Sequence, residues 1–344
     1  PDEIFASLST ARFFSKLDLS KGYWQIPLRD EDKEKTAFLT PEGLYQFKVM
    51  PFGLVNAPAT FSRMMRQVLR GMTQVQNYID DILVYTETWD QHLVILKQLL
   101  QRLREANLTA KPSKCQIGCQ DVEFLGHIVG QGKLQPMQDK LEKIRGARHP
   151  ETKKELRSFI GLASYYRKFI PNFSTIAAPL TDLTKNREPN KVVWTGKQEE
   201  AFTLLKEHLT CSPILCLPNF EQPFTLRTDA SDIGIGAVLL QDHEGVKRPV
   251  AYASRKLLPR EQAYSVMERE CLALVWGIAK FQIFLDGKEF VLETDHQPLS
   301  YLQRAKLLNS RIMRWALSLQ PFRFRIEAIP GVRNVGADFL SRAP

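Results

Sequence analysis

Two adjacent aspartates inside an apolar segment are the feature that most constrains this chain. Residues 75–85 read VQNYIDDILVY, so Asp80 and Asp81 form the polar centre of two short apolar runs. This pattern predicts a β-hairpin with both aspartates at its tip. A lone Asp-Asp pair is often a solvated turn. Ionised carboxylates bracketed by apolar residues, however, need a positive charge nearby.

A third aspartate ends another apolar segment. Residues 13–27, FFSKLDLSKGYWQIP, predict a strand that ends near Asp18 and leads into a short helix. Magnesium prefers oxygen ligands and is usually bound by protein carboxylates together with the phosphates of a substrate. Two such ions about 3.5 to 4 Å apart promote in-line phosphoryl displacement. Asp18, Asp80 and Asp81 are therefore candidate ligands of a two-metal site.

The C-terminal part predicts an α/β domain with a second group of acids. From Phe224 onward, strand patterns alternate with helices, including one long helix over residues 260–285. Each acid there could singly be a helix cap or a turn residue, but four acids from separate elements suit a second two-metal site. They are Asp229, Glu270, Asp295 and Asp338.

The charge distribution favours a polyanionic partner. The 344 residues predict about two domains and a connector. The net charge of +9 is uneven, because residues 131–228 hold 16 basic and 10 acidic residues, whereas residues 1–130 hold 15 of each. A basic middle between carboxylate-bearing ends fits nucleic acid, although a solvated charged face has similar counts. Residues 138–170 are predicted as one basic helix, in which Tyr165, Tyr166 and Phe169 either contact nucleic acid or form core.

Several classes of protein are excluded. No apolar run is long enough to span a membrane, and residues 1–25 lack the layout of a signal peptide. The five cysteines have no zinc-finger spacing and predict reduced thiols. We therefore expect no membrane partner and an intracellular location, in the cytoplasm for the simplest case, with the nucleus left open.

Four motifs, in order, resemble those of reverse transcriptases. Residues 78–81 resemble the YxDD box, LDLSKGYWQI resembles the first aspartate motif, MPFGLVNAPATF the nucleotide-binding loop, and VEFLGHIV the primer grip. GLASYYRKFIPNFS narrows the resemblance to the Pol polyprotein of gypsy-type long-terminal-repeat retrotransposons. The four C-terminal acids resemble the Asp-Glu-Asp-Asp set of ribonuclease H.

This resemblance implies an α+β polymerase palm and thumb, followed by a connection segment and an α/β ribonuclease H-like domain with a mixed five-stranded sheet. The expected boundaries are residues 1–130 for the palm with partial fingers, 131–222 for the basic thumb and connection, and 223–344 for the nuclease domain. Because Asp18 follows so soon after the start, we expect the right hand to be truncated at its N-terminal fingers.

The resemblance also implies individual roles. Asp18 and Asp80 would be the main polymerase metal ligands, with Asp81 in support, and the four C-terminal acids would bind metal in the nuclease. Tyr23 matches an aromatic gate against the ribose 2′-hydroxyl, or else is a core tyrosine. The remaining nucleotide contacts would be Phe52, Gly53 and Lys114, although Lys114 could equally be a surface lysine. The primer grip would comprise Phe124, Leu125, Gly126 and His127.

The implied function is an RNA-directed DNA polymerase with ribonuclease H activity. It would use two Mg²⁺ ions per site, with Mn²⁺ as an alternative. Its partners would be an RNA template, a DNA primer, the RNA–DNA hybrid and deoxynucleoside triphosphates, and its oligomeric state is left open. Two alternatives stay open: ribonuclease H activity alone, because fingers are missing, or a non-catalytic hybrid-binding remnant. The seven intact carboxylates argue against the remnant.

Overall fold

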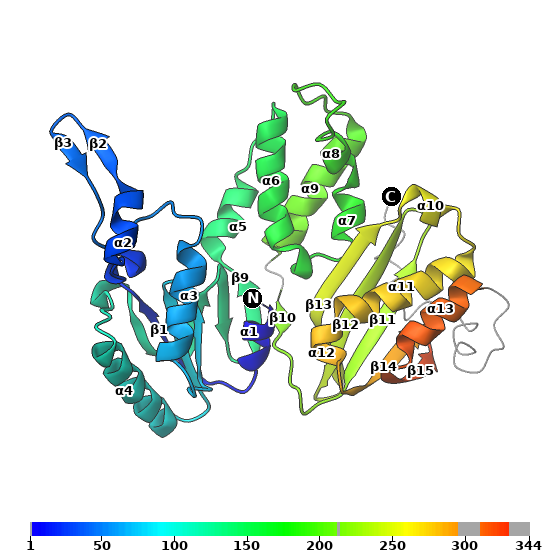
Figure 1. Cartoon of the computed structure of the whole chain (residues 1–344). Helices are drawn as coiled ribbons and strands as arrows, with labels where there is room; N and C mark the ends of the chain where they lie inside the picture. The colour runs from blue at the N-terminus through cyan, green and yellow to red at the C-terminus, as the bar shows by residue number, and fades with distance from the viewer. Residues whose placement is uncertain (1, 212–213, 295–309, 330–344) are drawn as a thin grey trace. The chain divides into compact units, whose positions relative to one another are not determined.

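The computed structural model describes residues 2–211, 214–294 and 310–329. The chain divides into two compact units, Pro1–Gly132 and Lys133–Pro344, which are described separately (Figure 1). All five cysteines are free thiols, as the sequence predicted. None of the helices within these ranges is both long and apolar enough to cross a membrane.

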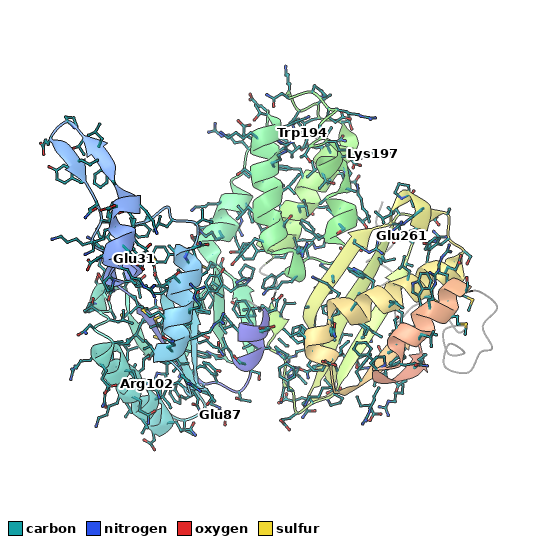
Figure 2. The ribbon with its side chains drawn as sticks, in the orientation of Figure 1. Glu31, Glu87, Arg102, Trp194, Lys197 and Glu261 are labelled. Carbon is teal, nitrogen blue, oxygen red and sulfur yellow. The ribbon has the colours of Figure 1, made fainter. Side chains whose placement is uncertain are left out.

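The first unit is built on a four-stranded antiparallel sheet in the order β4-β5-β1-β6. Its strands are β1 (Phe13–Asp18), β4 (Val75–Tyr78), β5 (Asp81–Thr86) and β6 (Gln116–Cys119). Helices α3 (Ala57–Val68) and α4 (Trp89–Glu105) cover one face, where Leu17, Phe61 and Ile82 share a core. Arg102 of α4, labelled in Figure 2, donates to the carbonyl oxygens of Val68 at 3.1 Å and Arg70 at 2.5 Å. These bonds tie the end of α3 to α4.

The alternation of side chains along β1 decides what the other face of this sheet presents. Leu17 points toward the core under α3 and α4, so its neighbours Lys16 and Asp18 point to the opposite face. Both of these charged residues are half-buried. The strand that supplies the core of this unit therefore also carries an acid on its accessible face.

Shorter elements complete the first unit. They are α1 (Asp2–Ser7), η1 (Gly22–Gln25), α2 (Asp30–Lys33), η2 (Glu34–Thr36), β2 (Phe38–Thr40), β3 (Gly43–Tyr45), η3 (Pro112–Lys114), β7 (Asp121–Phe124) and β8 (His127–Gly130). β2 and β3 form a hairpin whose side chains are largely exposed.

The second unit begins with a helical segment. After β9 (Lys133–Pro136), its elements are α5 (Gln138–Arg145), α6 (Lys153–Tyr165), η4 (Arg167–Phe169), α7 (Phe173–Ile176), α8 (Ala178–Asp182) and α9 (Gly196–Thr210). Strand β10 (Leu215–Cys216) then pairs with β9. Trp194, labelled in Figure 2, contacts Phe202 of α9 and donates its indole N–H to the Pro150 carbonyl oxygen at 3.0 Å.

The prediction of a single helix over residues 138–170 was wrong. α5 ends at Arg145 with Gly146 as its C-cap, and α6 starts only after Pro150, where Thr152 and Glu155 form a capping box. Proline cannot continue a helix, and a capping box satisfies the free N–H groups of a new one. Tyr166 and Phe169 are 1% and 2% exposed and belong to the core, whereas Tyr165 is exposed.

The rest of the second unit contains the mixed five-stranded sheet that the family resemblance implied. Its strand order is β13-β12-β11-β14-β15. β11 and β12, like β12 and β13, pair antiparallel, whereas β14 runs parallel to both β11 and β15. The strands are β11 (Phe224–Ala230), β12 (Gly234–His243), β13 (Val246–Lys256), β14 (Glu289–Thr294) and β15 (Arg323–Ala328).

The long helix predicted over residues 260–285 is divided into three. α10 (Pro259–Gln262), α11 (Val266–Lys280) and α12 (Gln282–Leu285) follow one another, and α13 (Ser310–Leu319) packs against α11. Ser265 causes one break, because its side chain accepts the Glu268 N–H and the two form a capping box. Arg311 of α13 pairs with Glu268 at 2.6 Å.

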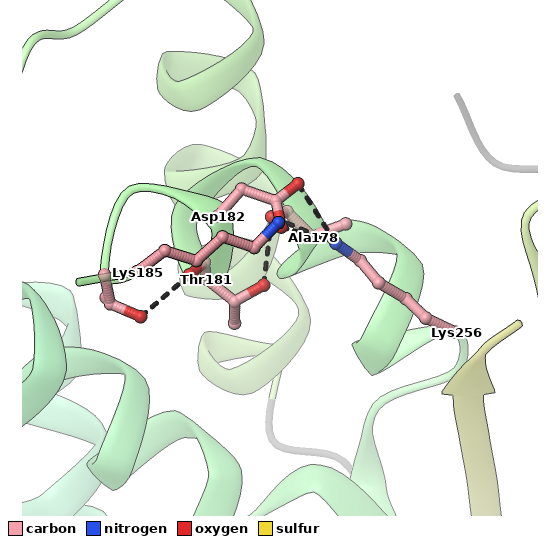
Figure 3. Close-up of polar contacts among 6 residues, drawn as sticks. Ala178, Thr181, Asp182, Lys185 and Lys256 are labelled. Atoms are coloured by element: carbon pink, nitrogen blue, oxygen red, sulfur yellow. Dashed lines mark hydrogen bonds and ion pairs between the residues drawn. The ribbon is translucent and has the colours of Figure 1, made fainter. Parts of the chain in front are cut away.

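The helical segment and the sheet of the second unit touch at β13. Lys256 Nζ lies 3.1 Å from Asp182 Oδ1 and 3.4 Å from the Ala178 carbonyl oxygen (Figure 3). The Ser174 hydroxyl donates to the Ser254 carbonyl oxygen at 2.7 Å. Polar contacts thus attach α7 and α8 to the edge of the sheet.

Candidate active sites

The hairpin predicted from VQNYIDDILVY is present in the first unit. Tyr78 of β4 pairs with Asp81 of β5, which leaves Ile79 and Asp80 as a two-residue turn. Asp80 therefore lies at the tip, whereas Asp81 is the first residue of β5. Ile79 has φ 54°, a left-handed conformation that is strained for a β-branched side chain. Such strain persists where the surrounding structure enforces it, often at functional sites.

The sheet register brings the third aspartate to this turn. Asp18, the last residue of β1, pairs directly with Asp81. Directly paired residues project from the same face of a sheet, so both carboxylates lie on the face opposite the α3–α4 core. The backbone N–H of Leu19 donates to the Asp80 carbonyl oxygen at 3.0 Å. The three predicted polymerase carboxylates are thus brought together.

Asp80 differs from Asp18 and Asp81 because its carboxylate lies against the backbone of Gly22. A Cβ atom on Gly22 would lie only 2.1 Å from Asp80 Oδ1, so glycine is what allows this approach. That oxygen is buried and accepts no hydrogen bond from the described residues. Burial, followed by the charges of Asp18 and Asp81, raises the pKa of Asp80, while Lys114 opposes the rise. A buried carboxylate oxygen without a hydrogen-bond donor is the type of ligand that a divalent cation prefers.

Two lysines pair with the other carboxylates. Lys114 Nζ lies 3.2 Å from Asp18 Oδ2, and Lys16 Nζ lies 3.2 Å from Asp81 Oδ1. Across residues 2–211, 214–294 and 310–329, no three acidic, histidine or cysteine side chains are close enough to enclose a metal ion. Sequence reasoning selected Lys114 but missed Lys16. The available signal was its spacing of two residues from Asp18 in a strand.

Tyr23 packs on the core and also lies near the acids. Its ring centroid is 5.3 Å from that of Phe52 and 5.6 Å from that of Phe61. Burial, and then the charge of Asp80, raises the pKa of Tyr23. Phe52 is 57% exposed, and Gly53 adopts φ 93° with open space around it. Tyr23 therefore links the exposed ring of Phe52 to the neighbourhood of Asp80.

The segment expected to grip the primer is a tight hairpin. β7 and β8 are joined by Leu125 and Gly126, both with positive φ. Phe124 and His127 are buried, and the His127 Nδ1–H donates to the Leu125 carbonyl oxygen at 2.6 Å. The half-buried turn, rather than the flanking rings, is therefore the accessible part of this motif.

Two of the four predicted nuclease acids can be placed. Asp229 of β11 is 2% exposed and Glu270 of α11 is 5% exposed. α11 packs on β11 and β12 through Gly277, whose Cβ position lies 3.0 Å from Thr228 Cγ2. Arg269 pairs with Asp232, which ties α11 to the β11–β12 turn. Asp295 and Asp338 lie outside the described residues.

An ion cluster around the buried carboxylate of Glu293 links the strands that lead to two of these acids. Glu293 of β14 is 4% exposed and pairs with Arg227 of β11 and Lys247 of β13. Arg227 and Glu293 are also register partners in the parallel pair. Burial alone would raise the pKa of Glu293, but hydrogen bonds from Lys247 and Arg227 leave it below the ordinary value.

Together these features define a class of protein. One unit has a four-stranded antiparallel sheet in which Asp18 pairs with Asp81, next to a hairpin turn that carries Asp80. The other has a mixed five-stranded sheet with buried acids on β11 and α11. The class is a polymerase palm linked to a ribonuclease H-like domain.

Comparison with known families agrees with this class. Residues 2–129 match the family model "Reverse transcriptase (RNA-dependent DNA polymerase)". Residues 219–322 match "RNase H-like domain found in reverse transcriptase". The chain belongs to the reverse transcriptase and ribonuclease H region of gypsy-type retrotransposon Pol polyproteins.

Relatives along the whole chain come from transposons. The Pol polyprotein from transposon 297 of Drosophila melanogaster is 40% identical over 99% of this chain and 32% of its own length. That from transposon gypsy of the same organism is 39% identical over 98% and 34%. The Tf2-3 polyprotein of Schizosaccharomyces pombe is 35% identical over 99% and 26%. The chain thus spans about a third of the length of these relatives or less.

Solved structures of a viral enzyme share the fold. Foamy viral protease-reverse transcriptase in complex with an RNA/DNA hybrid matches with a TM-score of 0.79 and 26% identity, over 99% of this chain and 46% of that one. The same enzyme in complex with dsDNA matches with a TM-score of 0.82 and 26% identity, over 95% and 70%.

Proposed function

We propose that this chain copies RNA into DNA in its first unit and cleaves the RNA strand of RNA–DNA hybrids in its second. The observation that carries the proposal is the gathering of Asp18, Asp80 and Asp81 by the β1–β5 register and the β4–β5 turn. The membership of both units in reverse transcriptase families supports it.

In the polymerase site, Asp18 and Asp80 would hold Mg²⁺, or Mn²⁺ as an alternative, with Asp81 in support. Bound divalent cations would lower the pKa of the primer 3′-hydroxyl and neutralise charge on the leaving pyrophosphate. Lys114, released from Asp18, would contact the triphosphate of the deoxynucleotide. Tyr23 would crowd the ribose 2′-position, with Phe52 and Gly53 beside it, and the Leu125–Gly126 turn would contact the primer.

In the nuclease site, Asp229 and Glu270 would hold the same cations together with Asp295 and Asp338. Their burial suits this role, because ionised carboxylates in a dry environment are stabilised by a bound cation. Arg269 and Glu268 would position α11 through their ion pairs with Asp232 and Arg311.

Nucleic-acid contact along residues 131–222, the proposed thumb and connection, would be electrostatic. Phosphate contacts from lysine and arginine give affinity without sequence preference. The related viral enzyme was solved with dsDNA and with an RNA/DNA hybrid, which supports the same kind of partner here. The domain boundaries at residues 130 and 222 belong to this proposal.

Primer extension and hybrid cleavage by the purified chain with Mg²⁺ test the proposal. Asp80→Asn should abolish extension and spare cleavage, whereas Asp229→Asn should do the reverse. Extension that survives Asp80→Asn would exclude the polymerase assignment, and cleavage that survives Asp229→Asn would exclude the nuclease one. Cleavage without any extension by the wild type would favour a nuclease alone. Hybrid binding without either activity would indicate a non-catalytic protein.

A further inference from the structure

Lys16 forms the ion pair with Asp81 from a position in the middle of the sheet. It pairs with Leu83 of β5 on one side and Gln116 of β6 on the other, so its backbone is fixed from both sides. Its side chain is 22% exposed and that of Asp81 is 28% exposed. Among the residues that the structure describes, Lys16 is the one cation within ion-pair distance of Asp81.

Lys114 has a different setting. It ends η3, a three-residue 3₁₀ helix, and its side chain is 56% exposed. A flexible ammonium group at the surface can leave Asp18 when a divalent cation arrives. Lys16 is more restrained than Lys114, because its backbone is held between two strands and its side chain is 22% rather than 56% exposed.

We propose that Lys16 is the permanent counter-cation of the polymerase site, and that it reserves Asp81 in an ion pair while Asp18 and Asp80 receive the divalent cations. Lys16 is then a positioning residue, since it acts through Asp81 and touches neither metal nor substrate. The inference rests on the proposed polymerase function and adds Lys16 to the residues of that site.

The charge balance gives this role a measurable consequence. Without Lys16 the carboxylate cluster carries one more uncompensated negative charge. Such a cluster attracts divalent cations more strongly but repels the triphosphate of the incoming nucleotide. Because the pair is partly exposed, solvent screens the effect. We expect Lys16→Met to tighten Mn²⁺ binding by about threefold to tenfold and to raise the KM for the nucleotide more than it lowers kcat.

Calorimetric titration of Mn²⁺ into the full chain, without nucleic acid, tests the inference apart from activity. All proteins would carry Asp229→Asn, so that the nuclease site contributes less. Lys16→Met should bind Mn²⁺ more tightly than the parent, and Lys16→Arg should match the parent because it keeps the charge. In the Asp81→Asn background, Lys16→Met should have little further effect, because the partner is already neutral. If Lys16→Met lowers the melting temperature, Lys16→Gln replaces it.

The outcomes separate this inference from the proposed function. If Asp80→Asn leaves Mn²⁺ binding unchanged, both the polymerase site and the role of Lys16 are overturned. If Asp80→Asn weakens binding but Lys16→Met behaves like Lys16→Arg, only the role of Lys16 is overturned. The same holds if Lys16→Met has an equal effect with and without the Asp81 carboxylate.

Discussion

At the residue scale, His92 shows how tightly the back of the palm sheet is specified. The Thr86 hydroxyl donates to the Thr88 carbonyl oxygen at 3.1 Å, so its oxygen accepts the His92 Nδ1–H at 2.9 Å. His92 Nε2 then accepts the Ser15 hydroxyl at 2.6 Å, and the Ser15 oxygen accepts the Gly118 N–H at 2.9 Å. This network uses a neutral imidazole ring and joins α4 to β1, β5 and β6.

Acid should therefore destabilise the fold through His92. Burial lowers its pKa, so below about pH 6.5 the unfolded chain binds a proton that the folded chain does not. The free energy of unfolding then falls as the pH falls. Denaturant unfolding between pH 8 and pH 5 should show a smaller loss for His92→Gln than for the wild type. Burial also lowers the pKa of His208, but this residue is present in both proteins and its contribution therefore cancels in the comparison. Equal losses would contradict the prediction.

Gly22 is a second position at the residue scale where a single added carbon atom would disturb the site. Gly22→Ala would place a methyl group 2.1 Å from the present position of Asp80 Oδ1, so the carboxylate must move. We expect primer extension to fall about 10- to 100-fold while the melting temperature changes little, because catalysis is sensitive to displacements of about 1 Å. Gly196→Ala is a matched control, since nothing lies within 4 Å of its Cβ position. Full extension by Gly22→Ala would show that Asp80 tolerates the shift.

The sequence identified the candidate metal ligands better than it identified the residues that position them. Asp18, Asp80 and Asp81 were selected because their apolar surroundings coincide with motifs that resemble those of reverse transcriptases, and the structure places them near one another. The close approach of Gly22 to Asp80 and the Lys16–Asp81 pair depend on register between distant strands, which periodicity cannot supply. Asp81 was expected at the hairpin tip, but the strained turn at Ile79 places it in β5.

At the scale of elements, the ion cluster on β14 should hold the five-stranded sheet of the ribonuclease H-like domain together. Glu293→Gln would remove the charge that Arg227 and Lys247 share. Both cations are partly exposed and can turn to solvent, so we expect a loss of about 1 to 3 kcal/mol in unfolding free energy. Chemical denaturation measures it, with Glu289→Gln, an exposed position on the same strand, as the control. An unchanged stability would show that burying the cluster costs as much as its ion pairs contribute.

The helix boundaries depend on individual capping residues, which the periodic pattern of the sequence does not reveal. The basic pattern of residues 138–170 continued through Pro150, and the apolar pattern of 260–285 continued through Ser265. In both places a capping box begins a new helix. The strands around the carboxylates were easier to predict, because apolar runs bounded by turn residues are short and unambiguous.

At the scale of the whole molecule, charge should dominate nucleic-acid binding. The basic excess of residues 131–228 predicts that hybrid affinity depends steeply on salt. We expect the dissociation constant for an RNA–DNA hybrid to rise at least about 100-fold between about 50 and 200 mM salt, as counterion release requires for several phosphate contacts. Fluorescence anisotropy with two hybrids of unrelated sequence should give the same slope. A shallow slope, or a clear sequence preference, would contradict electrostatic recognition.

The central claim is that each unit gathers acids into its own metal-dependent site. Crystals of the full chain with a primer–template and Mn²⁺ would test it directly through anomalous scattering. We predict separate manganese peaks, one set bound by Asp18 and Asp80 and another by Asp229 and Glu270. Saturating Mn²⁺ without a peak at Asp18 and Asp80, or with manganese bound only elsewhere, would contradict the account.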